Sequence, residues 1–277
     1  ERSRSPLTIV AEAKDLYQKG YKEVILLGQN VDSYRWNINK KEEVIDQNIP
    51  TTNFSELLEK VALVAKDLRV RFSTSHPKDM TDDVVHVMKK YRNICNYIHL
   101  PVQSGSSKIL QKMNRGYSKE WYLKRIKSIR EIIPDCAIST DIITGFCDES
   151  DEDFHETLDL MKKVEFNFSY MFFYSERPKT LAERKFKDNV PLEIKKSRLQ
   201  KVIDLQKEHS LKSNESSVGK IMEVLVEGPS KKSALEYCGR NDENYKVVFP
   251  KEHSKEGDYV NVLIERFTSA TLIGKII

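Results

Sequence analysis

Apolar residues follow two different patterns along this chain of 277 residues, and the pattern changes near residue 213. Before that point, short apolar runs alternate with stretches in which apolar residues recur every three or four positions. This alternation predicts strands and helices joined by right-handed crossovers, which build a parallel sheet. After it, short alternating strands are separated by turn pairs such as Gly228-Pro229 and Glu256-Gly257, which predicts a small antiparallel β-barrel.

Each strand predicted in the first part ends in polar residues. The strands are expected at 23–28, 69–76, 97–100, 136–145 and 166–174, and the helices at 6–19, 53–64, 81–88, 109–113, 118–133, 148–161 and 191–211. Asn53, Thr81 and Ser118 are expected to cap three of the helices. Because the first helix needs a strand before it, we expect an α/β fold, a partial (β/α) barrel of six strands that lacks the first one. The expected domains are 1–212 and 213–277.

Composition narrows the class of protein. Hydrophobic residues make up 39% and charged residues 32%, as in globular proteins, and the net charge of +4 is only a weak bias towards acidic partners. No apolar run approaches the roughly 18 residues that a membrane span requires. The four cysteines form no C-x-x-C pair, which indicates reduced thiols and a cytoplasmic protein rather than a disulfide framework or a zinc ribbon. The polar stretch 31–52 is expected to be a surface insertion.

The polar residues at the strand ends define a candidate ligand pocket. In a parallel barrel the carboxyl ends of the strands meet at one rim, and ligands bind there. The residues concerned are Gln29, Asn30, Ser73, Ser75, Gln103, Ser104, Asp141 and Thr144. For each one alone, an ordinary hydrogen bond at a strand end is an equal alternative, and only their convergence favours a ligand.

Three further side chains leave two interpretations open. Arg115 either clamps a carboxylate with two hydrogen bonds or caps a helix end. His76 and His99 have no second ligand at metal spacing in the sequence, so a structural role is favoured over a metal site.

Seven segments, in order along the chain, resemble motifs of the radical S-adenosylmethionine methylthiotransferases. They read Glu-Arg-Ser-Arg (1–4), Leu-Gly-Gln-Asn-Val-Asp-Ser-Tyr (27–34), Ser-His-Pro-Lys (75–78), His-Leu-Pro-Val-Gln-Ser-Gly-Ser (99–106), Met-Asn-Arg-Gly-Tyr (113–117), Asp-Ile-Ile-Thr-Gly-Phe (141–146) and Tyr-Ser-Glu-Arg-Pro-Lys-Thr (174–180). The Gly-Gln-Asn-Val segment favours the MiaB type, which methylthiolates the isopentenyl-adenosine beside the anticodon of tRNA, at position 37. The C-terminal strands resemble a TRAM domain, an RNA-binding module.

The resemblance implies S-adenosylmethionine as a cofactor and implies which residues of this chain would contact each of its groups. Gln29 or Asn30 would lie near its methionyl group, Arg115 near its carboxylate, Ser73 and Ser75 near its ribose, and the backbone from Ile143 to Gly145 near its adenine, with Gln103 in the same pocket. Asp141 would hold the ribose or a cation such as Arg115.

Two four-iron four-sulfur clusters are also implied for the whole protein. The family's C-x-x-x-C-x-x-C motif and the three cysteines of its N-terminal domain are not in this sequence. We therefore expect the cluster ligands upstream of Glu1 and expect this chain, as part of a longer enzyme, to be inactive alone. Cys147-Asp148 replaces the family's usual Pro-Gly, and Lys179 replaces a usual Gly, so two loops are expected to differ locally.

The resemblance also implies partners. Contacts to the anticodon arm of tRNA are expected from Arg2, Arg4, Arg177, Lys179, Lys231, Lys232, Arg240 and Arg266, although a solvated surface position is the alternative for any one of them. An electron donor such as a flavodoxin, a monomeric state and no membrane contact are expected. The alternative functions are a ribosomal-protein or threonylcarbamoyl-adenosine methylthiotransferase of the same family, or a non-catalytic RNA-binding scaffold.

Overall fold

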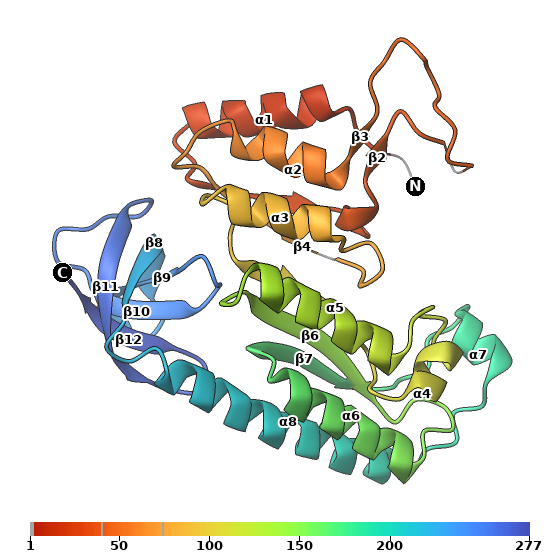
Figure 1. Ribbon diagram of the computed structural model, residues 1–277. Helices are drawn as coiled ribbons and strands as arrows, with labels where there is room; N and C mark the ends of the chain where they lie inside the picture. The colour runs from red at the N-terminus through yellow and green to blue at the C-terminus, as the bar shows by residue number, and fades with distance from the viewer. Residues whose placement is uncertain (1–2, 40, 74) are drawn as a thin grey trace.

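The computed structural model of the chain describes residues 3–39, 41–73 and 75–277. The first part consists of parallel strands with helices packed on their outer side, and the last part is a closed β-barrel. The long helix α8 (Leu192–Glu215) runs from the first part to the second (Figure 1). No helix in these described ranges combines the length and the apolar character that crossing a membrane requires.

Five strands form the parallel layer. They are β1 (Glu23–Leu27), β4 (Arg69–Ser73), β5 (Tyr97–His99), β6 (Ala137–Thr144) and β7 (Phe168–Phe173). β1 pairs with β4, and β5, β6 and β7 pair in that order. Val70 joins the two groups, because its N–H donates to the Asn93 carbonyl at 2.8 Å and its carbonyl accepts from the Cys95 N–H at 3.0 Å. The expected partial barrel is confirmed, with β1 and β7 as its edges.

The helices cover this layer with their apolar faces. They are α1 (Pro6–Gln18), α2 (Phe54–Ala62), α3 (Asp82–Lys90), α4 (Ser107–Lys112), α5 (Lys119–Ile132), α6 (Asp151–Val164), α7 (Leu181–Lys185) and α8. Asn53 and Ser118 cap α2 and α5 as expected. Thr81 stands at the cap position of α3, but its side chain makes no capping hydrogen bond, so that prediction was wrong in its detail.

The stretch after β1 folds back on itself. It contains the short helix η1 (Val31–Ser33) and the two-residue strands β2 (Arg35–Trp36) and β3 (Thr52–Asn53). The buried amide of Asn37 donates to the carbonyls of Asp46 and Ile49, which holds a polar loop that has few apolar residues of its own. The hydrogen bonds of this one side-chain amide thus connect the two ends of the loop.

The terminal barrel is built from β8 (Ile221–Ser230), β9 (Ser233–Arg240), β10 (Lys246–Pro250), β11 (Tyr259–Phe267) and β12 (Leu272–Ile276). Its strands close in the order β10-β12-β11-β8-β9 around a small core that includes Val224, Phe249 and Val262. The expected small β-barrel is confirmed, with one local difference, since β10 and β12 pair in parallel while the other neighbours are antiparallel. A closed ring of five strands cannot alternate in direction all the way round, so at least one pair must be parallel.

Two arginines of β4 fix the terminal barrel to the parallel layer. Arg69 and Arg71 are only 5% and 6% exposed. Arg69 donates to the carbonyl of Arg240 at 2.7 Å, and Arg71 donates to those of Asn241 and Asp242 at 2.6 and 3.1 Å. The Arg71 Nε also pairs with a Glu23 carboxylate oxygen at 2.8 Å. The turn between β9 and β10 is thereby held at the amino ends of the parallel strands.

Two tyrosines of the terminal barrel make further hydrogen bonds to the first domain. The Tyr259 hydroxyl donates to the carbonyls of Lys22 and Asp67 at 3.0 and 3.1 Å. The Tyr245 hydroxyl accepts from the Asn167 amide at 2.6 Å. Because every one of these bonds joins the two domains at a defined atom, their relative orientation is specific.

We expect replacement of Arg71 to weaken the whole molecule. In Arg71→Met, the carbonyls of Asn241 and Asp242 and the carboxylate of Glu23 lose their donor, which should lower the free energy of unfolding by about 3 kcal/mol. Denaturant unfolding measures this loss, with Arg266→Met on the exposed side of β11 as the control. Equal effects of the two substitutions would contradict the role given to Arg71.

Candidate functional site

A pocket of about 240 Å³ lies at the carboxyl ends of the parallel strands. It contains three residues that the sequence assigned to the cofactor, Gln103, Arg115 and Ile143. The other lining residues are Lys112, Met113, Asn114, Phe146, Tyr174, Leu181 and Ala182. The pocket is therefore apolar on most sides, with an amide and a guanidinium among its polar groups.

Gln103 is placed by backbone pairing beyond the end of β5. Its N–H donates to the Asp141 carbonyl and its carbonyl accepts from the Ile143 N–H, both at 2.9 Å. Its φ of 74° is in the left-handed region, which is rare for a residue with a side chain. The strand pairing around Pro101 thus imposes a strained backbone at a residue that lines the pocket.

Arg115 lies in a tight turn after α4 between two residues of positive φ, Asn114 and Gly116. Its guanidinium donates to the Tyr117 hydroxyl at 3.2 Å and to the Pro101 carbonyl at 3.3 Å. It forms no ion pair with a carboxylate in the described ranges. Two neutral acceptors orient the group and leave its charge uncompensated, which is the state that an anionic ligand needs.

Asp141 does not pair with Arg115, one of the two partners expected for it, and its contact with the ribose stays a prediction. The Asp141 carboxylate instead lies 3.4 Å from Nε2 of His99, whose Nδ1 is 2.8 Å from the Ser139 hydroxyl. Both side chains lie on the inner face of the sheet, because strand alternation puts them on the side away from the helices. His99 has the structural role that the sequence favoured, since its two ring nitrogens lie beside Asp141 and Ser139.

A second polar cluster joins the loops after β1 and β4. Asn30 donates to Asp79 at 2.6 Å, and Ser75 donates to Asp32 at 3.0 Å. Asp32 is 7% exposed, and burial raises the pKa of its carboxyl to about 7. Asn30 Oδ1 and Asp32 Oδ2 are buried with no hydrogen-bond partner in the described ranges. The Asp32 carboxyl therefore carries its proton below about pH 7.

His76 connects this cluster to the pocket. Its ring packs edge-on against Tyr117 with 5.7 Å between centroids, and Tyr117 is the residue that orients Arg115. Burial and then the charge of Arg115 lower the pKa of the His76 imidazole. The loops after β1, β4 and α4 thus form one rim, and His76 is neutral near pH 7.

Other predicted cofactor residues have different surroundings. Gln29 is exposed, and Ser73 ends β4 half-buried. Gly145 is buried, donates its N–H to Glu149 at 2.6 Å and has a φ of 70°. A Cβ added there would lie 2.3 Å from Cγ of Lys195, so only glycine fits between β6 and α8. Its role in cofactor binding stays a prediction.

The sequence reading missed the aromatic wall of the pocket. The rings of Phe146 and Tyr174 meet edge to face at 4.8 Å, and Phe186 packs against Phe146 at 6.1 Å. Phe146 and Tyr174 both stand inside the recognised motifs, so the signal was present, but their role depends on β6 and β7 being neighbours. Burial raises the pKa of the Tyr174 hydroxyl to about 12, so it stays protonated.

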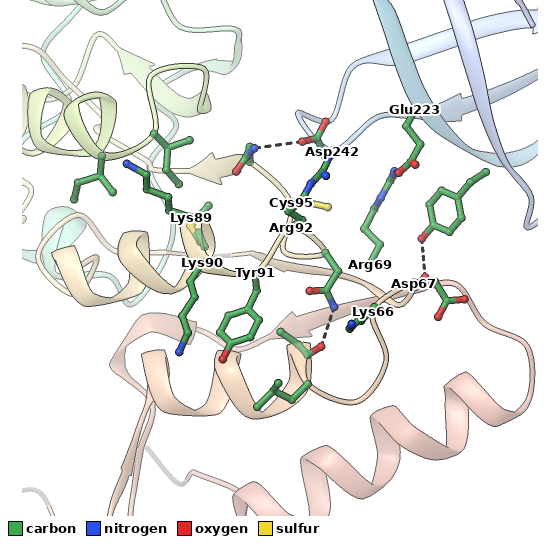
Figure 2. Close-up of a pocket in the computed structure, with 18 of the residues that line it drawn as sticks. Lys66, Asp67, Arg69, Lys89, Lys90, Tyr91, Arg92, Cys95, Glu223 and Asp242 are labelled. Atoms are coloured by element: carbon green, nitrogen blue, oxygen red, sulfur yellow. Dashed lines mark hydrogen bonds and ion pairs between the residues drawn. The ribbon is translucent and has the colours of Figure 1, made fainter. Parts of the chain in front are cut away.

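A larger cleft of about 990 Å³ lies at the other end of the strands (Figure 2). It is bounded by the ends of α2, α3 and α5 and by the terminal barrel, and Figure 2 shows Arg69 reaching across it towards Glu223, 3.8 Å away. Size does not make this cleft the site, because ligands of parallel barrels bind at the carboxyl ends. The polar rim described above lies there, so we place the site at the smaller pocket.

The cations expected to contact RNA fall into two groups. Arg4 pairs with Glu12 at 2.8 Å and Arg240 pairs with both oxygens of Glu227, so their charges are balanced in this state. The exposed ones without an ion pair in the described ranges are Arg177, Lys179, Lys231, Lys232 and Arg266. Arg2 lies outside the described residues.

Two family models match this chain. The radical SAM superfamily model matches residues 1–161 and the TRAM domain model matches residues 215–277. The chain therefore belongs to the radical SAM superfamily and carries a TRAM domain at its end.

Individual relatives of the chain indicate a narrower class than the superfamily model does. It is 56% identical over 279 residues to a tRNA-2-methylthio-N(6)-dimethylallyladenosine synthase of Amoebophilus asiaticus and 53% identical over 280 residues to the protein of that name from Christiangramia forsetii. The alignments cover 100% and 99% of this chain but only 57% and 58% of those proteins. The chain thus spans little more than half the length of these relatives.

The family implies two kinds of bound group, S-adenosylmethionine and iron–sulfur clusters. The described residues suit S-adenosylmethionine. The unpaired charge of Arg115 and the apolar walls of the pocket match the carboxylate and the nucleoside of S-adenosylmethionine. No group of three His, Cys, Asp or Glu side chains suited to a metal ion occurs in the described residues.

Asp32 should make stability fall as pH rises. A carboxyl whose pKa is about 7 when folded and 3.8 when free keeps its proton on folding, so its contribution is complete below pH 4 and is lost between pH 4 and 7. The loss should approach about 4 kcal/mol. Burial also raises the pKa of the Glu243 carboxyl to about 7, so the chain and Asp32→Asn share that part of the pH dependence. Melting curves of both between pH 4 and 8 measure the Asp32 part as their difference, and the fall should be smaller in the variant.

The control for this experiment is Asp135→Asn, at an exposed carboxylate before β6. It should keep the pH profile of the unaltered chain. If Asp32→Asn also kept that profile, the buried carboxyl would not be the group responsible.

Proposed function

We propose that the parent protein of this chain is a tRNA methylthiotransferase that converts isopentenyl-adenosine beside the anticodon to its 2-methylthio derivative. The name of the relatives that are 56% and 53% identical over essentially the whole chain supports this substrate and product. The structural feature that supports the proposal most strongly is the pocket at the strand ends. There Arg115 has a charge with no carboxylate partner in the described ranges.

The residues of this chain bind and orient in this proposal. Bound S-adenosylmethionine supplies the radical chemistry of the superfamily. Arg115 would hold its carboxylate, since Tyr117 and the Pro101 carbonyl already orient the guanidinium. The aromatic wall of Phe146 and Tyr174 excludes water from the reacting side of the pocket.

The parent protein also needs iron–sulfur clusters, an electron donor and a contact with the tRNA. The iron–sulfur clusters belong to the remainder of the parent protein, because the described residues offer no ligand set for them. An electron donor such as a flavodoxin, a monomeric enzyme and a cytoplasmic location complete the proposal. The TRAM domain, held by Arg69 and Arg71, supports a contact with the tRNA outside the pocket.

The direct test uses the full-length parent protein prepared without oxygen, with iron and sulfide. After incubation with tRNA, S-adenosylmethionine and a reductant, nucleosides are analysed by mass spectrometry. A methylthio group on isopentenyl-adenosine is the expected product. Unchanged tRNA with a protein that holds its clusters would reject the proposal.

Arg115 should set the affinity for the cofactor. In the full-length protein, Arg115→Gln removes a charge-assisted pair of hydrogen bonds and should raise the Kd for S-adenosylmethionine by about 10- to 100-fold. Equilibrium dialysis measures this without any turnover. Arg184→Gln, on the exposed surface of α7, is the matched control and should leave the Kd unchanged.

A further inference from the structure

One face of the edge strand β7 carries three aromatic rings with no layer over them. Ser169 is buried and donates to Gln206 of α8, and Met171 packs against the core. Alternation along the strand therefore puts Phe168, Tyr170 and Phe172 on the opposite, inner face of the sheet. These side chains are 48%, 48% and 54% exposed.

The rings stand beside hydrogen-bonding groups on the neighbouring strands. In the register of the sheet, Phe168 is opposite Ser139 and Tyr170 is opposite Asp141. The ring of His99 meets that of Tyr170 edge to face at 5.6 Å. Rings and polar groups thus alternate across the inner face, so that a flat ligand lying on a ring would have a donor or acceptor at its edge.

Positive charge continues from the end of this strand. Arg177 and Lys179 follow β7 within a few residues, are exposed, and form no ion pair in the part of the chain that the structure describes. The rim with Arg115 lies at the same end of the sheet. At the other end lies the TRAM domain.

We propose that the inner face of β7 is a stacking platform for unpaired nucleobases of RNA. The rings of Phe168 and Tyr170 meet edge to face at 4.9 Å, so one of them would take the base face and the other would hold that ring in place. Asp141 would accept from an exocyclic amino group, and Arg177 and Lys179 would bind the phosphates of the same strand. This inference rests on the proposed function, because it takes the RNA to be the tRNA loop that carries the modified adenosine.

The polar groups favour RNA over an apolar protein segment. The Asp141 side chain is 28% exposed, and its one partner within ion-pair distance in the described ranges is His99. An apolar segment laid over β7 would bury this carboxylate without a new donor, which is costly. A base supplies a ring for the aromatic side chain and a donor for the carboxylate together.

The test uses the full-length parent protein and an RNA stem-loop with the anticodon-loop sequence, containing 2-aminopurine in place of an unpaired base. Tyr170→Leu and Phe168→Leu should each weaken RNA binding about tenfold, the loss expected for one stacked base. They should also reduce the quenching of 2-aminopurine fluorescence on binding. Phe173→Leu, on the same strand but the opposite face, is the matched control and should change neither.

A tryptophan probe distinguishes RNA from other occupants. In Phe172→Trp, the emission of the new indole should be accessible to acrylamide in the free protein and protected when the stem-loop binds. Protection already present without RNA would mean that the rest of the parent chain covers this face, and the proposal would be wrong. Unchanged RNA affinity of both leucine variants would also overturn it.

These outcomes are separate from those of the proposed function. If tRNA acquires the methylthio group but Tyr170→Leu and Phe168→Leu bind RNA normally, only the stacking platform fails. If the leucine variants lose affinity but the unaltered enzyme never modifies tRNA, the platform stands and the proposed reaction fails.

Discussion

The arrangement of this molecule depends on two buried guanidinium groups. Arg69 and Arg71 stand on the inner face of β4, where an apolar side chain would ordinarily lie, and they donate to successive carbonyls of residues 240–242. A buried positive charge is tolerable only when acceptors surround it, and the turn between β9 and β10 supplies them. The requirement is reciprocal, since those carbonyls need donors at a contact that excludes water.

That contact decides what the rest of the sheet can do. The turn of the terminal barrel occupies the amino ends of the parallel strands, and helices cover their outer side (Figure 1). The carboxyl ends and the inner face between the edge strands β1 and β7 remain available. Ile25 and Leu27 of β1 are 50% and 74% exposed there, as are the aromatic rings of β7. A ligand pocket and an accessible sheet face therefore belong to one continuous surface.

The rim of the pocket shows how local strain and burial serve a site. Gln103 and the turn around Arg115 have left-handed backbone, and Asp32 is buried without a compensating charge. Each of these features is unfavourable by itself. Together they leave the Arg115 charge without a carboxylate partner in the described ranges, at the edge of the sheet where the pocket lies.

Much of the fold could be read from the sequence because its signals are local. The apolar runs gave the five parallel strands within a few residues, and the Asn53–Glu56 capping box marked the start of α2, since both depend on neighbours three or four positions away. Thr81 is the exception, because it stands at the cap position of α3 but its side chain makes no capping hydrogen bond. Gln103, Arg115 and Ile143, three of the residues that the motifs assigned to the cofactor, line one pocket, and the cofactor roles of all the assigned residues stay predictions.

What the sequence by itself determined was thus the order of strands and helices, the family resemblance and the polar strand ends. Only the tertiary structure decided which of those ends share a pocket, that Asp141 faces His99 instead of Arg115, and that Arg69 and Arg71 hold the terminal barrel. The physical reason is distance along the chain. Arg71 and Asn241 are far apart in sequence, and no propensity or spacing rule reports a hydrogen bond between a side chain and a backbone carbonyl that only folding brings together.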